Sequence, residues 1–228
     1  MKRSKTDGRL AKAAAAKAAR PYHHGDLRRA LIAAAMTLLE REGAEALSFR
    51  AVARAADVSQ AAPYNHFSGK EDLLATLAEA GFRTLAASQA ETAARLSEPL
   101  ERMVGLGLDY IGFAVARPQL YRLMFGVGVA DWHAYPLVSE AKHATFAPTR
   151  AALADYLAVD TPPETRERAA IAAWGLVHGL AMLRIDGSLG QGRAAADPEL
   201  VQGILRLFAG GLIHGAASQH DGARDGRA

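Results

Sequence analysis

LSFRAVARAADVSQAAPYNHFSGKEDLL, residues 47–74, is the most informative stretch of this chain. Ser48 and Ser59 are suited to cap two short helices, and the Asp-Val-Ser segment between those helices predicts a tight turn. Ser68 is predicted to open a further helix, with Glu71 completing a capping box. Two short helices joined by a turn are the arrangement that presents one helix to the major groove of DNA.

Several side chains of this stretch are expected to point away from the core and toward DNA. Gln60 and Asn65 can pair with adenine in the major groove, and a methyl group such as that of Ala61 can contact thymine. Tyr64 and His66 suit phosphate contacts, as does a lysine beside the N–H groups of a helix start. The predicted DNA-contacting residues are Arg50, Ser59, Gln60, Ala61, Tyr64, Asn65, His66 and Lys70.

Positive charge is concentrated toward the N-terminus. Residues 1–70 hold 13 Lys and Arg against 6 Asp and Glu, whereas residues 71–228 hold 14 against 18. This asymmetry is expected where a phosphate-binding module is joined to a nearly neutral body. Residues 1–20 are rich in Ala, Lys and Arg, and they are predicted to form a disordered basic arm. The arm is either a DNA contact or an inert solvated tail.

The rest of the chain predicts an all-α fold of about nine helices, because no segment shows the period-2 alternation of strands. The first helix is predicted to start near Asp26 and to stop at Gly43, and a long helix should follow Ser68. Prolines at helix starts place further helices at 99–116, 118–126, 136–157, 163–186 and 197–215. Pro148 lies inside one of these and should kink or split it.

Residues 22–84 resemble the DNA-binding domain of the tetracycline-repressor (TetR) family of transcriptional regulators. The matching segments are Phe-Arg-Ala-Val-Ala at 49–53, Ala-Asp-Val-Ser at 56–59, Tyr-Asn-His-Phe at 64–67 and Lys-Glu-Asp-Leu-Leu at 70–74. The resemblance implies an all-helical homodimer that binds a palindromic double-stranded DNA operator and a small-molecule effector, usually as a repressor. Ala62-Pro63 departs from the family pattern, and the proline is expected to shift the reading helix slightly.

A second resemblance lies in the C-terminal half. Trp174-Gly-Leu-Val-His-Gly179 is similar to the Trp-His-Gly motif that names one C-terminal subclass of the family, and residues 22–28 also resemble that group. The implied organisation is an arm at 1–20, a helix-turn-helix domain at 21–68, an effector-binding and dimerisation domain at 69–216, and a disordered tail at 217–228.

An effector pocket needs apolar walls with a few directed polar groups. The candidate ligand-binding residues are Tyr110, Phe113, Tyr121, Phe125, Trp132, Trp174 and His178. Trp174 and His178 are four residues apart and share one helix face, which either supports the pocket or packs as ordinary core. Leucines and glycines in the last two predicted helices favour a four-helix dimer interface, with packing inside one subunit as the alternative.

Enzymatic activity, a metal site and a cofactor are not expected. The chain has no cysteine, which excludes disulfides and thiolate sites and fits a cytoplasmic protein. No signal peptide is recognised, and the longest apolar run, 169–183, is too short to span a membrane. The motifs of hydrolases, phosphate loops, zinc proteases and dinucleotide sites are missing, and adjacent His23 and His24 lack further ligands. The alternatives to a ligand-responsive regulator are a non-specific DNA-binding protein and, less favoured, a small all-helical enzyme.

Overall fold

The part of the chain that the computed structural model describes, residues 24–126, 134–189 and 198–225, consists of helices and short connections without a strand. In chain order the elements are α1 (His24–Glu42), α2 (Phe49–Ala55), the 3-10 helix η1 (Ala62–Asn65), α3 (Lys70–Arg95), α4 (Pro99–Ala116), α5 (Pro118–Phe125), α6 (Pro136–Ala144), α7 (Ala147–Tyr156), α8 (Pro163–Ile185) and α10 (Pro198–Asp225). The predicted all-α fold is confirmed. The predicted basic arm, 1–20, lies outside the described residues.

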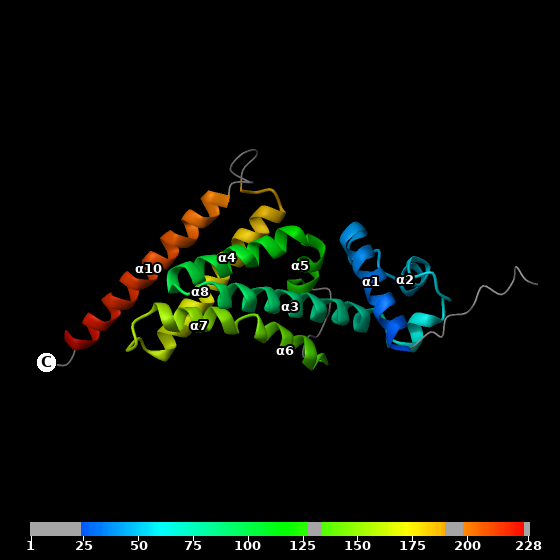
Figure 1. Ribbon diagram of the computed structural model, residues 1–228, viewed down its shortest axis with the longest axis horizontal. Coiled ribbons are helices and arrows are strands. Elements are labelled where there is room, and N and C mark those ends of the chain that lie inside the picture. Colours follow the sequence, from blue (N-terminus) through cyan, green and yellow to red (C-terminus); the bar gives the residue numbers. More distant parts are fainter. Residues whose placement is uncertain (1–23, 127–133, 190–197, 226–228) are drawn as a thin grey trace, which may run out of the picture.

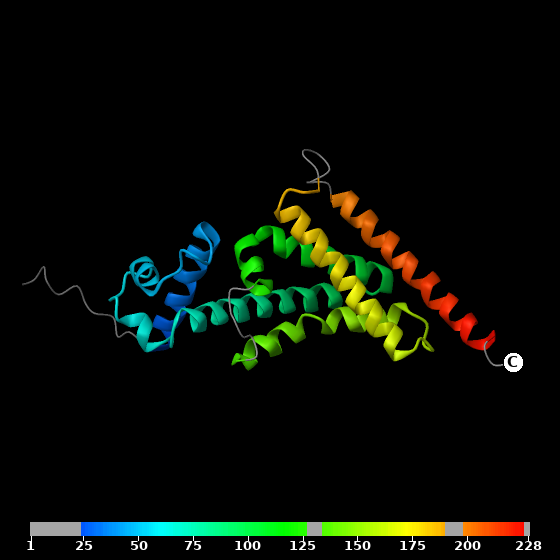
Figure 2. The same cartoon turned by 180° about the vertical axis from the view of Figure 1, so that it is seen from behind.

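The helices form an elongated molecule (Figures 1 and 2). α1, α2 and η1 lie together at one end, and α10 lies at the other. α3 begins beside α1 and continues into the body, where it packs against α4, α5, α6 and α7. Its 26 residues span about 39 Å at the rise of an α-helix. One continuous helix therefore joins the N-terminal end to the body.

The N-terminal end folds around a small apolar core that includes Leu31 and Phe67, both buried. α1 stops at Gly43, whose φ of 80° is a left-handed conformation that glycine adopts without steric cost. Ser48 caps α2, since its hydroxyl oxygen accepts a hydrogen bond from the Ala51 N–H at 3.2 Å. The predicted helix stop and the predicted cap are both confirmed.

The segment expected to read DNA is shorter than predicted. Instead of a helix capped by Ser59, a turn leads into the 3-10 helix η1, and its N-cap residue Ala61 makes no side-chain capping bond. Pro63 explains the difference, because a proline has no N–H that could donate to the Ser59 carbonyl. That carbonyl accepts from the Ala62 N–H at 3.0 Å instead, which closes a tighter turn than an α-helix would.

The start of α3 also differs from the prediction. The helix begins at Lys70 with Gly69 as N-cap residue, and the capping box of Ser68 and Glu71 is not formed. The Asp72 carboxylate instead accepts hydrogen bonds from the Ser68 N–H at 2.8 Å and from the Ser68 hydroxyl at 3.2 Å. Because the helix starts later than predicted, Asp72 is its third residue, the position from which a side chain can reach back.

The later helices start at or close to prolines. α4 and α5 begin at Pro99 and Pro118, and the predicted helix at 136–157 is split into α6 and α7, with Pro148 in the first turn of α7. α10 continues to Asp225, so most of the segment predicted as a disordered tail, 217–228, is helical. That segment contains no proline, and a polar composition does not by itself end a helix.

Helix α5 connects the N-terminal end of the molecule to the body. On one side it packs closely against Gly81 of α3, where an added Cβ would lie only 2.6 Å from the Met124 sulfur. On the other side it contacts α1, because the Leu120 N–H donates a hydrogen bond to Glu40 Oε1 at 3.2 Å. The N–H groups at a helix start lack intrahelical partners and attract negative charge, so this carboxylate stabilises the start of α5.

Candidate functional site

The predicted DNA-contacting side chains are mostly exposed at the N-terminal end of the molecule. Exposed residues are Arg50, Ser59, Gln60, Ala61, Tyr64, Asn65 and Lys70, and His66 is partly buried. Tyr64 is 70% exposed, and the edge of its ring contacts Phe49 with centroids 4.9 Å apart. Beneath them, Pro63 and Phe67 are buried. η1 is thus fixed on the core with its polar side chains turned outward. The eight predicted DNA-contacting residues are called the reading surface: Arg50, Ser59, Gln60, Ala61, Tyr64, Asn65, His66 and Lys70.

Lys70 of the reading surface and Arg28 of α1 are two cations at this end of the molecule. The Lys70 ammonium donates a hydrogen bond to the Glu45 carbonyl at 3.2 Å, which ties the start of α3 to the loop before α2. Arg28 of α1 is exposed, and its guanidinium carbon lies 5.4 Å from the centre of the Phe67 ring. Arg28 is not among the predicted DNA-contacting residues, because its position depends on how α1 packs against Phe67, which no local pattern reveals.

A cavity of about 50 Å³ lies in the C-terminal domain. Its walls come from α3, α4, α7, α8, α10 and the connection between α6 and α7. The described lining residues are Gln89, Met103, Leu106, Gly107, Tyr110, Thr145, Phe146, Thr149, Ala173, Trp174, Leu176, Val177, Leu205 and Phe208. None of them is charged. The cavity is far smaller than the about 300–1,000 Å³ typical of sites for drug-sized ligands.

Five of the predicted ligand-binding residues come together at this cavity. Tyr110 and Trp174 line it. Tyr121 and His178 lie directly behind Tyr110, and the Phe125 ring lies edge-on to His178 with centroids 5.0 Å apart. Tyr121 is fully buried and is not among the described lining residues, so it lies behind the cavity wall.

Of the remaining two predicted residues, Phe113 is not brought to the cavity. Phe113 is not among the described lining residues, and the Arg117 guanidinium lies 6.0 Å from the centre of its ring. Trp132 lies outside the described residues. Three residues that were not predicted, Gln89, Thr145 and Thr149, also supply polar groups to the wall. A buried glutamine on a long amphipathic helix gives no sequence signal that distinguishes it from a solvated one.

A chain of hydrogen bonds runs behind the cavity. The Tyr121 hydroxyl donates to the Tyr110 oxygen at 3.0 Å, and the Trp174 indole N–H donates to the same oxygen at 3.3 Å. Nδ1 of His178 lies 2.6 Å from the Tyr121 oxygen and 3.3 Å from the Tyr110 oxygen. Residues from α4, α5 and α8 are therefore joined at one point, next to the cavity.

The buried position of this network shifts the pKa of its members. Burial raises the pKa of Tyr110 to about 12, against the opposing hydrogen bonds from Tyr121 and Trp174. Burial likewise raises the pKa of Tyr121. Burial, and next the charge of the nearby Lys142, lower the pKa of His178 below its usual 6.5. At neutral pH all three groups are therefore uncharged, as expected for polar side chains in an apolar wall.

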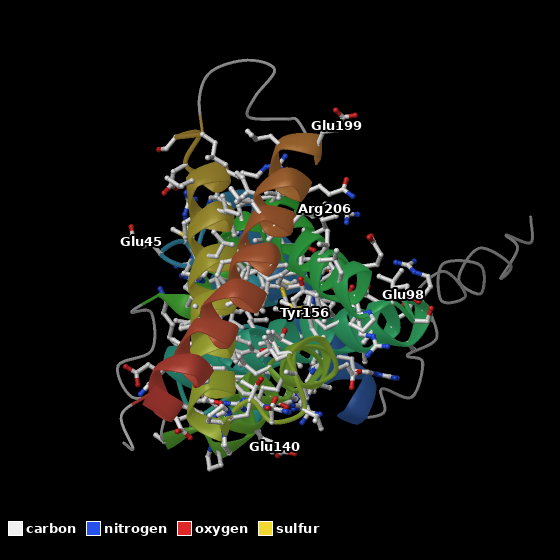
Figure 3. All side chains as sticks on the ribbon, turned by 90° about the vertical axis from the view of Figure 1, so that its left-hand side faces the viewer. Glu45, Glu98, Glu140, Tyr156, Glu199 and Arg206 are labelled. Carbon is white, nitrogen blue, oxygen red and sulfur yellow. The ribbon has the colours of Figure 1, made fainter. Side chains whose placement is uncertain are left out.

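A second exposed surface runs along α8 and α10, which lie next to each other in the body (Figure 3). A Cβ added at Gly175, Gly179, Gly203 or Gly211 would meet no atom within 4 Å, so these glycines face open space. Leu180 of α8 is buried and does not belong to this surface. We call the following residues the α8–α10 face: Ile171, Gly175, Gly179, Leu183, Leu200, Gly203, Leu207 and Gly211.

By length and composition alone, α8 could cross a membrane. It packs against α4 and α7, however, and core helices of water-soluble proteins meet the same two criteria. Within the described ranges, no three His, Cys, Asp or Glu side chains are grouped as metal ligands.

Sequence and structure comparisons identify the family. Residues 31–77 match the domain described as bacterial regulatory proteins, tetR family, and residues 103–208 match the tetracyclin repressor-like C-terminal domain. A protein of unknown function from Rhodococcus sp. RHA1 is 37% identical, with 85% of this chain and 99% of that chain covered and a TM-score of 0.73. The chain belongs to the TetR family. It is a DNA-binding transcriptional regulator with a helix-turn-helix domain.

Two further structures share the fold of this TetR-family chain at lower identity. The fatty acid degradation regulator FadR from Bacillus halodurans is 16% identical, with 84% and 98% of the two chains covered and a TM-score of 0.66. FadR from Bacillus subtilis, in complex with stearoyl-CoA, is 12% identical, with 81% and 97% covered and a TM-score of 0.62. Comparison with curated protein sequences gives no match. The Trp-His-Gly subclass stays a prediction.

Proposed function

We propose that this chain is a cytoplasmic homodimeric repressor that leaves a palindromic operator when a small molecule enters the C-terminal cavity. The observation that carries the proposal is the course of α3, which has Lys70 of the reading surface at its first turn and Gln89 in the cavity wall. A ligand that moves α3 therefore moves the DNA-binding end.

The reading surface supports sequence-specific contact. Gln60 and Asn65 are exposed amides, the side chains that pair with adenine, and Tyr64 stands out of the core beside them. Lys70 and the first N–H groups of α3 offer a phosphate contact. Because η1 is a short 3-10 helix, fewer of its side chains reach the groove than in a full recognition helix, and the turn residues Gln60 and Ala61 gain importance.

The α8–α10 face supports a homodimer. It exposes Leu207, Leu183 and Ile171 to solvent, which is unfavourable in a monomer, and its glycines allow backbones to approach closely. Two helices from each subunit would form a four-helix interface. The two reading surfaces would then enter successive major grooves about 34 Å apart.

A second connection supports coupling between ligand and DNA. The network behind the cavity includes Tyr121 of α5, and the preceding residue, Leu120, donates its N–H to Glu40 of α1. A ligand that displaces Tyr110 or Trp174 would pull on α5 and, through it, on α1. To act, it must bind more tightly to a subunit geometry in which the reading surfaces no longer fit successive grooves.

Selection of bound duplexes from a random pool by the full chain tests this function. We expect a palindromic consensus bound at physiological salt far more tightly than random duplex. Binding with steep salt dependence but no consensus would show a non-specific DNA-binding protein instead. Addition of cavity ligands to the selected complex then tests release.

A further inference from the structure

The cavity wall contains an acceptor whose orientation is fixed. Gln89 is 2% exposed, and its Nε2 donates to the Leu106 carbonyl at 3.0 Å and to Asp109 Oδ2 at 2.8 Å. Both partners are pure acceptors, so the nitrogen of the amide must face them and not the oxygen. The Ser88 hydroxyl holds the other Asp109 oxygen at 2.6 Å. The carbonyl oxygen of Gln89 is therefore the group that this side chain can offer to a ligand.

Tyr110 supplies a donor to the same cavity. Its oxygen accepts from Tyr121 and from Trp174, as described above. With Tyr121 assigned as the donor to Tyr110, the hydrogen of the 2.6 Å contact between Tyr121 and His178 comes from Nδ1 of His178. Nδ1 then cannot accept from Tyr110. With this assignment, the hydroxyl hydrogen of Tyr110, a residue that lines the cavity, can be donated to a ligand.

The charges around the cavity oppose an anionic ligand. The described lining residues include no Lys, Arg or His that could pair with a carboxylate or a phosphate. The ionisable group bonded to Gln89 is the carboxylate of Asp109, which repels negative charge. The desolvation cost of an unpaired ion in such a wall is comparable with the whole affinity of a small ligand.

We infer that the cavity takes a small neutral ligand whose hydroxyl group donates to Gln89 Oε1 and accepts from the Tyr110 hydroxyl. This inference rests on the proposed function only in assigning that ligand the role of effector. The rest of the ligand contacts apolar side chains, among them Leu106, Leu205 and Phe208. The volume of about 50 Å³ admits only a small ligand, and a single aromatic ring fits when flexible Met103 moves aside. The negative charge and the size of fatty acids and acyl-CoA thioesters oppose their binding in this cavity.

Calorimetry on the full-length protein tests the ligand class with phenol, toluene and benzoate, which differ in one substituent on the same ring. We expect phenol to bind about tenfold or more tightly than toluene, since its hydroxyl makes two buried hydrogen bonds. Benzoate and stearoyl-CoA should show no saturable binding. Tyr110→Phe should weaken phenol binding about tenfold and leave toluene binding unchanged. Gln89→Leu should do the same if it folds.

Tyr156→Phe is the matched control, because Tyr156 loses the same hydroxyl on α7, away from the cavity lining. Absence of phenol binding, equal binding of phenol and toluene, or tighter binding of benzoate or stearoyl-CoA each overturns the inference. Measurement of operator affinity with each ligand distinguishes the inferred ligand class from the proposed function. Phenol binding without loss of operator affinity supports the ligand class and contradicts the proposed function. Operator release by benzoate or stearoyl-CoA alone supports the proposed function and overturns the ligand class.

Discussion

Nδ1 of His178 lies 2.6 Å from the Tyr121 hydroxyl, and this contact joins α8 to α5 directly behind the cavity. α8 carries part of the exposed α8–α10 face, and α5 begins at a hydrogen bond to α1. One pair of side chains thus connects the proposed dimer interface, the ligand cavity and the DNA-binding end.

The buried position of His178 predicts a pH dependence of stability. Its pKa is lowered in the folded state, so below pH 6.5 the unfolded chain binds a proton that the folded chain resists. The free energy of unfolding should therefore fall as pH drops below 6.5 and be insensitive to this group above it. His178→Gln removes the titration, so the variant should lose less stability between neutral and acidic pH. Thermal unfolding at several pH values measures this, and parallel curves for both proteins would contradict it.

The hydrogen bond between Glu40 and Leu120 predicts that a variant without it loses part of the coupling between ligand binding and operator binding. Glu40→Ala removes the acceptor, and the ligand-induced change in operator affinity should shrink by about 0.5–2 kcal/mol. Glu40→Gln keeps an acceptor oxygen and should restore most of the coupling. Glu42→Ala, an exposed carboxylate on the same helix, is the control and should change nothing. Operator affinity is measured with and without ligand, and full coupling in Glu40→Ala would rule out this path.

Gln60→Ala should relax base preference. The side chain is exposed, so folding should be unaffected, while discrimination at one base pair of each half-site should fall by about 1–3 kcal/mol. Lys70→Ala should instead weaken binding to all duplexes alike, because a phosphate contact carries no sequence information. Competition between operators with single substitutions distinguishes the two. A uniform loss in Gln60→Ala would mean that this residue does not read bases.

The charge of residues 1–20 predicts the effect of removing them. They contribute 7 Lys and Arg against a single Asp, so most of the positive charge of residues 1–70 lies there. Deletion should lower affinity for specific and random duplexes alike. The slope of log K against log salt should fall by about 0.9 for each phosphate that the shortened protein no longer neutralises. An unchanged slope would identify the segment as an inert tail.

Leu207→Glu should disrupt the dimer. Leu207 is 80% exposed on the α8–α10 face, so a charge there costs nothing in a monomer but is buried without a partner in the proposed interface. The dimer dissociation constant should rise by about tenfold or more. Val159→Glu makes a similar change in an exposed connection outside this face and serves as the control. Analytical ultracentrifugation measures both, and an intact Leu207→Glu dimer would place the interface elsewhere.

Features that depend on neighbours along the chain could be predicted from the amino-acid sequence. The stop at Gly43, the cap at Ser48, the starts of α4 and α5 at prolines and the split near Pro148 follow from backbone conformation and hydrogen bonding. The same local rules wrongly predicted an α-helix capped by Ser59. Pro63 has no N–H to donate to the Ser59 carbonyl, and a suitable capping residue does not compensate for that missing hydrogen bond. They also predicted that Glu71 would complete the cap of α3, whereas Asp72 accepts the hydrogen bonds from Ser68. An error of one residue in the helix start changes which side chain can reach back to the residues before the helix.

The composition of the cavity and the two connections that leave it arise only when the helices pack together. Tyr110, Tyr121 and His178 lie on three helices, and Glu40 and Leu120 are far apart in sequence. In the sequence, Gln89 cannot be distinguished from a solvent-exposed polar residue of a long helix. In the folded chain, α4 packs against it and buries it. Such contacts depend on which helix faces meet and on how deeply each side chain is buried, and no periodicity along one chain segment specifies that.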